Sequence, residues 1–349
     1  MAKTSSPTIL TSLSFLFIVL CGGYAAWSLV RIISTTAPDF AFYYGQVPNL
    51  LPPPSVVLYL PLRLIPFRIM EGLWVLGSLV LLVDVVRRVA FKINLRSFSE
   101  VGIVASIAFL SFPSRFTLGM GQVNIIALWL LVRSWEQTAP MWSGILFAIA
   151  VLFKPELAIL GIPILYEGRW KMCIAATGII AVFSGLALLL WGMPVYQSYF
   201  LNVSSLFSDS SGLAIYYNQG ITGMLVRAGI WDRLLFTVIA TLLIGGALRA
   251  IKHTIHNKWD QTIWLFMPAL LLIEPLAWQH HLVFLIPTYI LVWRTLRGSM
   301  EKSLFISSLV LISWNFTNPA NIDTMPLAWL ALSHGTIGIL ILWGLLLRR

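Results

Sequence analysis

The sequence contains little charge. Only 10% of its 349 residues are Asp, Glu, Lys or Arg, whereas 58% are hydrophobic and the mean hydropathy is +0.87. Soluble domains usually carry about 25% charged residues, so a soluble globular fold is excluded. A hydrocarbon core about 30 Å thick needs roughly 20 apolar residues per helix. The long apolar runs do not alternate as membrane strands do. They predict an all-α, polytopic membrane helical bundle, with residues 1–349 forming one domain.

Cysteine is also scarce. Cys21 and Cys173 are the only two, and both lie inside apolar runs, which excludes a disulfide framework and a cysteine-based metal motif. The net charge of +10 comes from basic residues scattered between apolar runs, without a stripe or a tail. This distribution argues against a nucleic-acid partner and indicates loop anchors at a membrane surface. The first run, Ile9 to Val30, is longer than a signal-peptide core and is expected to be an uncleaved first helix.

The apolar runs predict about twelve membrane spans. With the amino terminus on the cytoplasmic side, most of the 23 basic residues fall in alternate connections on that same side, as the positive-inside rule requires. The localisation expected from this pattern is that of a multi-pass integral membrane protein. The predicted spans are 9–33, 67–86, 100–113, 122–134, 140–153, 156–166, 171–191, 231–250, 259–274, 281–296, 303–316 and 328–347.

Three stretches on the outer side do not read as spans. Leu51 to Pro66 carries prolines at both ends and is expected to be an interfacial or re-entrant helix. Gln219 to Gly229 is expected to be a similar short helix. The stretch Gly192 to Asn218 is rich in Ser, Asn and aromatic residues, which is typical of a lid or a substrate-contacting loop.

Almost every uncommon polar group near membrane depth falls at the outer ends of the predicted spans. Ionisable groups in a membrane are costly and mark functional sites by default. This shared side predicts an active site at the extracytoplasmic face, centred on Asp39. The remaining candidates for substrate contact are Tyr43, Tyr44, Arg115, Gln122, Asn124, Lys154, Glu156, Asn218, Gln219, Trp278, His280 and His281.

Several of these residues have an equally ordinary structural interpretation. Asp39 follows a proline, as turn residues often do. Lys154 and Glu156 are suited to pair with each other, and Gln122 and Asn124 lie at a helix start, where amides cap helices or bond between them as readily as they bind sugar hydroxyls.

The aromatic and basic candidates leave similar choices. Adjacent histidines on a helix point about 100° apart, so His280 and His281 are a poor metal pair and no metal site is expected. Their imidazoles suit a phosphate or a proton instead. Trp278 fits an aromatic belt or a platform for a sugar ring, and Arg115 fits an anionic head group or ordinary lipid phosphates.

The order of these motifs resembles glycosyltransferase family 87, also known as DUF2029 proteins, which include mycobacterial polyprenol-phosphate-mannose-dependent α-1,2-mannosyltransferases. The resemblance runs over nearly the whole chain. It rests on Asp39, Pro52-Pro53, Gly121-Gln122-Val123-Asn124, Lys154-Pro155, Asn218-Gln219-Gly220, and Trp278-Gln279-His280-His281 with Pro287.

The resemblance implies a GT-C fold, a polyprenyl-phosphate sugar as donor, and inverting transfer of a hexose, expected to be mannose, to a lipid or glycan acceptor. By match of position, Asp39 would be the general base. The partners implied are the lipid-linked donor, the acceptor and membrane lipids, with no cofactor. One positioned carboxylate is sufficient for inverting chemistry, because only the acceptor hydroxyl has to be deprotonated.

Two other classes of protein remain open at this stage. A transporter or flippase of lipid-linked sugars would also need polar groups in the membrane, although such proteins usually carry repeats and a binding site near the midplane. A surface-polysaccharide polymerase or ligase would be expected to centre on arginines and a histidine in one large outer loop. The stretch Gly192 to Asn218 contains neither residue type.

Overall fold

The computed structural model describes residues 9–45, 51–206, 211–255, 262–323 and 325–348. Within these ranges the chain is helical throughout, and its only β-type pairing is an isolated antiparallel bridge between Asn218 and Trp278. The elements are α1 Ile9–Ser34, α2 Pro38–Gly45, α3 Pro53–Tyr59, η1 Leu60–Leu64, α4 Phe67–Lys92, α5 Phe98–Leu110, α6 Phe112–Met120, α7 Asn124–Glu136, α8 Pro140–Phe153, η2 Pro155–Leu160, α9 Gly161–Tyr166, α10 Trp170–Trp191, α11 Met193–Leu206, α12 Ile221–Arg227, α13 Arg233–Ile255, α14 Thr262–Ile273, η3 Gln279–Leu285, α15 Ile286–Trp293, α16 Ser299–Ser313, α17 Ala320–Asp323, α18 Ala328–Ala331 and α19 His334–Leu347, where η marks a 3-10 helix.

The long apolar helices confirm a polytopic membrane protein. Among the described residues, α4, α10 and α13 are each long and apolar enough to cross a membrane, and the bent pair α5 and α6 is a fourth candidate. That pair bends by 63°. The chain leaves the helical conformation at Ser111, and Pro113 lies in the first turn of α6, where its missing N–H is tolerated.

About twelve spans are predicted, whereas the described residues contain three helices that are long and apolar enough to cross a membrane, or four with the bent pair. Several predicted spans are not single long helices. The run 156–166 consists of η2 and α9, 281–296 consists of η3 and α15, and 328–347 is divided between α18 and α19. Pro163 lies inside the first of these runs and Pro287 opens α15. Prolines remove backbone donors, so breaks at these points follow from the sequence, although hydropathy alone does not show them.

The connections that were expected on the outer side agree with two predictions and correct a third. Residues 51–66 form the short helices α3 and η1, and residues 219–229 contain α12. The predicted loop 192–218 is in large part a helix, because α11 covers Met193–Leu206 and packs against α10. Gly192, at φ +73°, ends α10 and reverses the chain, and Tyr196 then donates its hydroxyl to Ser184 O at 2.7 Å. Residues 207–210 of the predicted loop lie outside the described residues.

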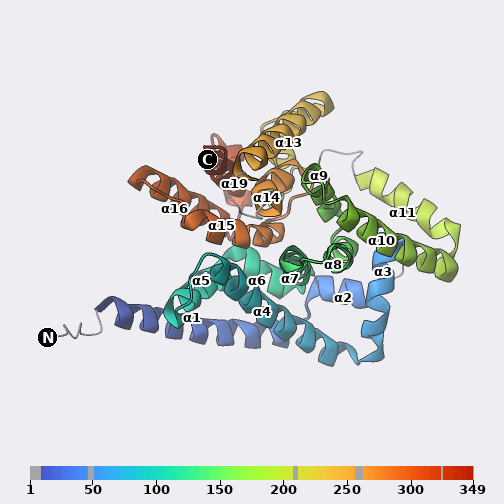
Figure 1. Ribbon diagram of the computed structural model, residues 1–349, viewed down its shortest axis with the longest axis horizontal. Helices are drawn as coiled ribbons and strands as arrows, with labels where there is room; N and C mark the ends of the chain where they lie inside the picture. Colours follow the sequence, from blue (N-terminus) through green and yellow to red (C-terminus); the bar gives the residue numbers. More distant parts are fainter. Residues whose placement is uncertain (1–8, 46–50, 207–210, 256–261, 324, 349) are drawn as a thin grey trace.

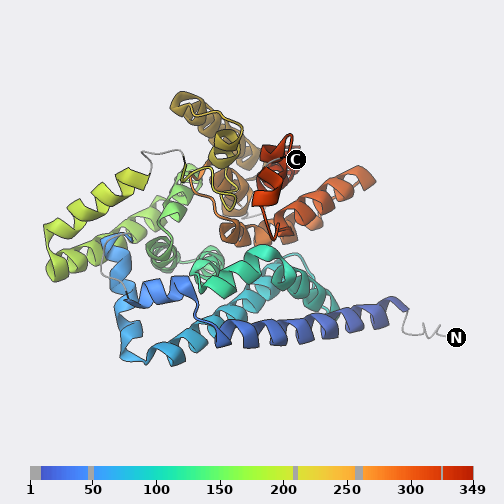
Figure 2. The same cartoon turned by 180° about the vertical axis from the view of Figure 1, so that it is seen from behind.

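The core is one large apolar cluster contributed mainly by α4, α5, α7, α8, α14, η3, α15 and α19. Figures 1 and 2 show α1 and α4 together along one edge of the molecule, with α2 and α3 near the beginning of α4. A second, smaller cluster encloses Phe40 and Tyr43 of α2 with Tyr59, Trp74 and Val123. This small cluster lies beside the candidate site.

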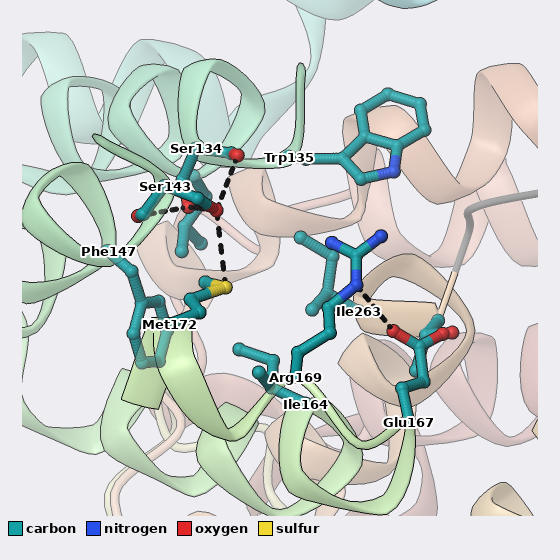
Figure 3. A pocket seen from close by; sticks show the side chains of 11 residues that line it. Ser134, Trp135, Ser143, Phe147, Ile164, Glu167, Arg169, Met172 and Ile263 are labelled. Carbon is teal, nitrogen blue, oxygen red and sulfur yellow. Dashed lines mark hydrogen bonds and ion pairs between the residues drawn. The ribbon is translucent and has the colours of Figure 1, made fainter. Parts of the chain in front are cut away.

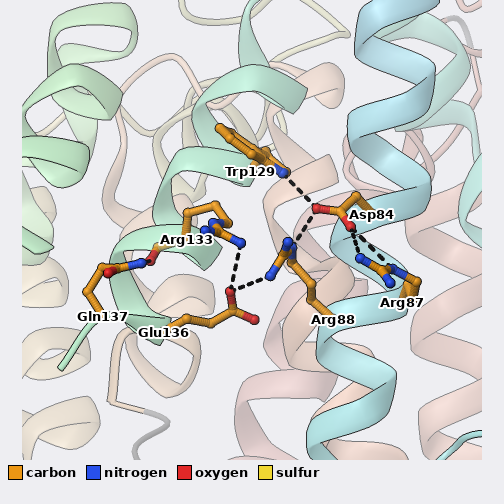
Figure 4. Close-up of polar contacts among 7 residues, drawn as sticks. All are labelled: Asp84, Arg87, Arg88, Trp129, Arg133, Glu136 and Gln137. Atoms are coloured by element: carbon orange, nitrogen blue, oxygen red, sulfur yellow. Dashed lines mark hydrogen bonds and ion pairs between the residues drawn. The ribbon is translucent and has the colours of Figure 1, made fainter. Parts of the chain in front are cut away.

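Helices α4 and α7 run parallel, so the polar groups near their amino termini are separated from the polar groups near their carboxyl termini. Trp74 contacts Gly121 near their amino termini, whereas Arg88 contacts Glu136 near their carboxyl termini. Figure 4 shows the carboxyl-terminal network, in which Asp84 binds Arg87, Arg88 and Trp129 Nε1. Fourteen helical residues span about 20 Å, so this basic network and the amino-terminal polar groups lie at opposite ends of the helix pair.

Candidate active site

Asp39 lies in the first turn of α2, directly after Pro38, and its side chain is half-buried. Its Oδ2 accepts a hydrogen bond of 2.5 Å from Gln122 Nε2. The oxygen of the same amide, Gln122 Oε1, accepts the hydroxyl of Tyr43 at 2.6 Å. Gln122 therefore joins α2 to the turn between α6 and α7, and both ends of its amide are oriented by partners.

Burial raises the pKa of Asp39 above its ordinary value, although the hydrogen bond from Gln122 and the charge of Lys154 act in the opposite direction. A carboxylate with a raised pKa is a stronger base than one in water. Because one face of Asp39 is engaged by Gln122 and the group is only half-buried, it is suited to accept a proton from a bound hydroxyl.

Lys154 stands at the point where α8 ends and Pro155 begins η2. Its buried Nζ lies 2.6 Å from Glu156 Oε1 and 2.7 Å from His281 Nε2. An ammonium group has only donors, so the neutral His281 ring must accept through Nε2 and carry its hydrogen on Nδ1. His281 Nδ1 lies 2.7 Å from Glu274 Oε1, at a contact whose angle is not that of a regular hydrogen bond.

The three ligand atoms of Glu156, Glu274 and His281 lie within 4.8 Å of one another, the one group among the described residues with the composition of a metal site. The Lys154 ammonium contacts two of these three side chains. A divalent ion would have to displace this ammonium, which already supplies positive charge to the cluster. The residues present therefore fit an internal cation better than a bound metal.

His280 is buried and holds η3 in place. Its carbonyl oxygen accepts from Asn124 Nδ2 at 3.0 Å and from Thr117 Oγ1 at 3.1 Å. Burial, together with the nearby His281 and Lys154, lowers the pKa of the His280 ring well below its ordinary value. A lowered pKa favours the neutral form of the ring, and the phosphate contact expected for His280 stays a prediction.

Trp278 belongs to a row of aromatic rings beside His280. The planes of Trp278 and Tyr217 are nearly parallel, at 10°, with centroids 6.3 Å apart. Phe116 lies against Tyr217 and His280, at 5.3 Å from each. Phe116, Tyr217 and Trp278 are only partly buried, so this row offers an apolar surface next to the polar cluster.

The structure gives five of the sequence candidates other contacts. Asn124, Asn218 and Gln219 are at most 1% exposed, and their amides bond to backbone groups. Tyr44 donates its hydroxyl to Ile65 O. Arg115 bonds to Tyr24 of α1 and to Leu110 O. These contacts give each of the five side chains a structural partner within the protein, and the substrate contact expected for them stays a prediction.

Three residues at the site were not among the sequence candidates. Glu274 contacts His281, as described above. Glu71 and Trp74, on one face of α4, bond to the backbone of Ala37 and Gly121. A carboxylate inside the apolar run 67–86 is itself a signal, since such groups are costly in a membrane. What Glu71 contacts is visible only in the fold.

Two cavities lie outside the polar cluster. Between α11, α12, α13 and α14 is a groove of about 560 Å³ with Ile221, Phe236 and Ala240 among its apolar lining residues. It reaches Ile273 and Pro275, the neighbours of Glu274 in the chain. Among the described residues that line it, the one basic side chain is Arg233.

The second cavity lies between α7, α8, α10 and α14 and measures about 20 Å³, room for about one water molecule. Figure 3 shows that it is bordered by the paired Ser134 and Ser143, with Met172 accepting from Ser143, and by the Arg169–Glu167 ion pair. It is near the carboxyl terminus of α7, away from Asp39, and serves packing.

The polyprenol-phosphate-mannose-dependent alpha-(1-2)-phosphatidylinositol pentamannoside mannosyltransferase of Mycolicibacterium smegmatis is 25% identical over 276 residues, covering 75% of this chain and 63% of that protein. The protein of the same name from Mycobacterium tuberculosis strain CDC 1551 is 25% identical over 275 residues, covering 75% and 60% respectively. The chain thus spans less than two thirds of the length of these relatives.

No solved structure matches the chain. The model of glycosyltransferase family 87 matches residues 49–275, which is more than half of the chain. The matched stretch includes Gln122, Lys154 and Glu274, whereas Asp39 and His281 lie outside it. On the length of this match, the chain belongs to glycosyltransferase family 87.

Proposed function

We propose that this chain transfers a hexose, mannose in the first instance, from a polyprenyl-phosphate donor to an acceptor hydroxyl, with inversion at the anomeric carbon. The observation that carries the proposal is the arrangement of one half-buried carboxylate, Asp39, bound by Gln122 on one side and within the field of the Lys154 ammonium. Family membership and the names of the mannosyltransferase relatives support the donor class.

At the acceptor, Asp39 takes the hydroxyl proton while the oxygen attacks the anomeric carbon. Gln122 holds the carboxylate from the α6–α7 side, and the Tyr43 hydroxyl of α2 orients the Gln122 amide, which favours the reactive geometry. A raised pKa places Asp39 closer to the pKa at which a general base is most effective near neutral pH.

At the donor, the bond between the anomeric carbon and the phosphate oxygen breaks, and polyprenyl phosphate leaves with the electron pair. The Lys154 ammonium is the group that stabilises this negative charge. Two of its contacts, with Glu156 and His281, fix its position, so it needs little reorganisation when the charge develops. His281 in turn is oriented by Glu274.

The lipid chain of the donor needs an apolar path to the site. The groove between α11, α12, α13 and α14 is adjacent to Glu274 through Ile273 and Pro275, and its lining is mostly apolar. We assign the isoprenoid chain to this groove. The proposed acceptor class follows the names of the relatives, which specify a phosphatidylinositol pentamannoside. We further propose that the site faces the outer side of a bacterial plasma membrane.

The test uses the purified full chain in detergent, with polyprenyl-phosphate mannose as donor and phosphatidylinositol mannosides as acceptors. Mass spectrometry of the lipid products is expected to show mannose transfer by the wild type and its loss in Asp39→Asn. Asp232→Asn, at the exposed beginning of α13, is the matched control and should retain activity. Full turnover by Asp39→Asn would reject the base assignment.

The same preparation separates transfer from transport. In sealed vesicles, movement of the donor lipid between leaflets without formation of a mannosylated product would favour a flippase over the proposed transferase.

A further inference from the structure

Glu71 is a buried carboxylate near the beginning of α4, with 2% of its surface exposed. Its Oε1 accepts the backbone N–H of Ala37 at 2.6 Å. Its Oε2 accepts from Arg68, whose side chain is 62% exposed, at 2.8 Å. Ala37 immediately precedes α2, and its carbonyl accepts the first helical bond, from Ala41. Glu71 therefore fixes the backbone position from which Asp39 projects.

Trp74 lies three residues farther along the same face of α4. Its Nε1 donates to the carbonyl oxygen of Gly121 at 2.9 Å. Gly121 directly precedes Gln122, the residue that binds Asp39. One helix face thus contacts both backbone segments whose side chains meet in the Asp39–Gln122 hydrogen bond.

These two segments approach each other closely at Gly121. A Cβ atom at this position would lie 2.6 Å from Phe40 Cβ and 2.9 Å from Ala37 Cβ, and the residue has φ +68°. The Trp74 ring packs against Phe40 with centroids 5.4 Å apart. The contact tolerates almost no displacement, because interiors are close-packed and the neighbouring atoms are main-chain or Cβ atoms.

We propose that Glu71 and Trp74 are positioning residues for the transfer reaction, which set the relative position of Asp39 and Gln122 through the backbone. This inference rests on the proposed function, in which Asp39 is the base. Neither residue touches substrate in this proposal. Each acts by holding one of the two segments against the rigid helix α4.

The energetics favour a specific role over general packing. A buried carboxylate is costly unless it is hydrogen-bonded, and an apolar residue of similar size at position 71 would fill the same space. Glu71 instead uses one oxygen for a single backbone N–H more than thirty residues away. A displacement of about 1 Å in a reactive group can reduce a rate by about 10²-fold. Loss of the bond between Glu71 and Ala37 N–H should therefore affect the turnover rate more than the packing.

The experiment compares Glu71→Leu with Glu71→Gln in the full chain, assayed with polyprenyl-phosphate mannose as donor. Glu71→Leu removes the acceptor for Ala37 N–H and is expected to lower kcat by about 10- to 100-fold, with a much smaller change in the donor KM. Glu71→Gln retains an oxygen for the N–H and is expected to recover most of the rate. A purely structural role would lower the amount of folded protein and leave kcat per folded molecule unchanged.

Two further variants keep the test decisive if Glu71→Leu does not fold. Trp74→Phe removes the N–H donor to Gly121, together with part of the ring that packs against Phe40, and is expected to lower kcat. Arg68→Gln removes the exposed partner of Glu71 and should leave kcat unchanged.

Where Glu71→Leu folds, the double variant gives a further test. In a Gln122→Ala background, Glu71→Leu should cause little additional loss of kcat, because both changes act on the same carboxylate, that of Asp39.

The outcomes distinguish this inference from the proposed function. If Asp39→Asn is inactive while Glu71→Leu and Trp74→Phe turn over at the wild-type rate, the positioning inference is overturned and the base assignment stands. If Asp39→Asn is fully active, the proposed base fails irrespective of position 71. Equal losses in Glu71→Leu and Glu71→Gln would also overturn the inference, because the backbone acceptor would not be the relevant feature.

Discussion

Lys154 Nζ lies 2.7 Å from His281 Nε2, and this contact joins the end of α8 to η3 across 127 residues of sequence. It also determines the tautomer of His281, because the ammonium can only donate. The contact holds the one buried ammonium group of the cluster in a fixed position from which its charge acts on Asp39, and the proposed reaction uses the same charge to stabilise the leaving phosphate.

Lys154→Met is expected to reduce kcat by about 10²- to 10³-fold, since it removes a fixed cation that stabilises the leaving group. Methionine has a similar volume, so packing is largely maintained. The measurement is steady-state mannose transfer, with the exposed Lys252→Gln on α13 as control. Wild-type turnover in Lys154→Met would show that the leaving phosphate does not depend on this ammonium.

The pH dependence should follow Asp39. A general base acts only when deprotonated, so the rate is expected to fall as the pH decreases through the Asp39 pKa, which burial raises above its ordinary value. The hydrogen bond from Gln122 lowers this pKa. Gln122→Ala should therefore move the acid limb of kcat/KM to higher pH, and Asp232→Asn should not. A limb that moves to lower pH in Gln122→Ala would contradict the assignment.

Gly121→Ala is expected to impair the protein strongly. The new Cβ would approach Phe40 and Ala37 to less than 3 Å, at a left-handed backbone position that disfavours other residues. Both the melting temperature in detergent and the transfer rate should fall. Gly119→Ala, two residues earlier and within α6, has no atom within 4 Å of its added Cβ and serves as the matched control. Equal behaviour of the two variants would argue against the close contact.

Gln219→Leu tests the structural role that the fold gives to this residue. Its amide donates to the carbonyl oxygens of Tyr216 and Leu332, and it accepts from Gly335 N–H. Leaving these buried groups without partners costs about 1–3 kcal/mol each. We expect a lower melting temperature, with the activity per folded molecule retained. A stable variant with lost donor binding would restore the predicted substrate contact.

The direction of the chain in the membrane can be tested by labelling single cysteines. In a background with Cys21 and Cys173 replaced by serine, Ile230→Cys before α13 is expected to react with an impermeant reagent from outside. Met300→Cys at the beginning of α16 should react only after the membrane is opened. Both positions are exposed. The reverse pattern would invert the positive-inside assignment and place the site on the cytoplasmic face.

The sequence by itself determined the class of protein and the residue types of the site. Low charge and long apolar runs indicate helices in a membrane. The hydrocarbon core contains no water, and a helix forms all of its backbone hydrogen bonds within its own segment. The rarity of polar groups at membrane depth singled out Asp39, Gln122, Lys154 and His281. The structure joins them as two hydrogen-bonded pairs, Asp39 with Gln122 and Lys154 with His281, and the charge of Lys154 acts on Asp39.

Only the tertiary structure decided what each polar group contacts. Hydropathy cannot distinguish an amide that faces a ligand from one that bonds to a distant backbone group, so the backbone partners of Asn124, Asn218 and Gln219 are visible only in the fold. Prolines broke several predicted spans into short helices whose lengths depend on packing. The bonds from Glu71 and Trp74 to Ala37 and Gly121 likewise cross 34 and 47 residues. Such separations are set by how α4 packs against α2 and α7, and no local pattern encodes them.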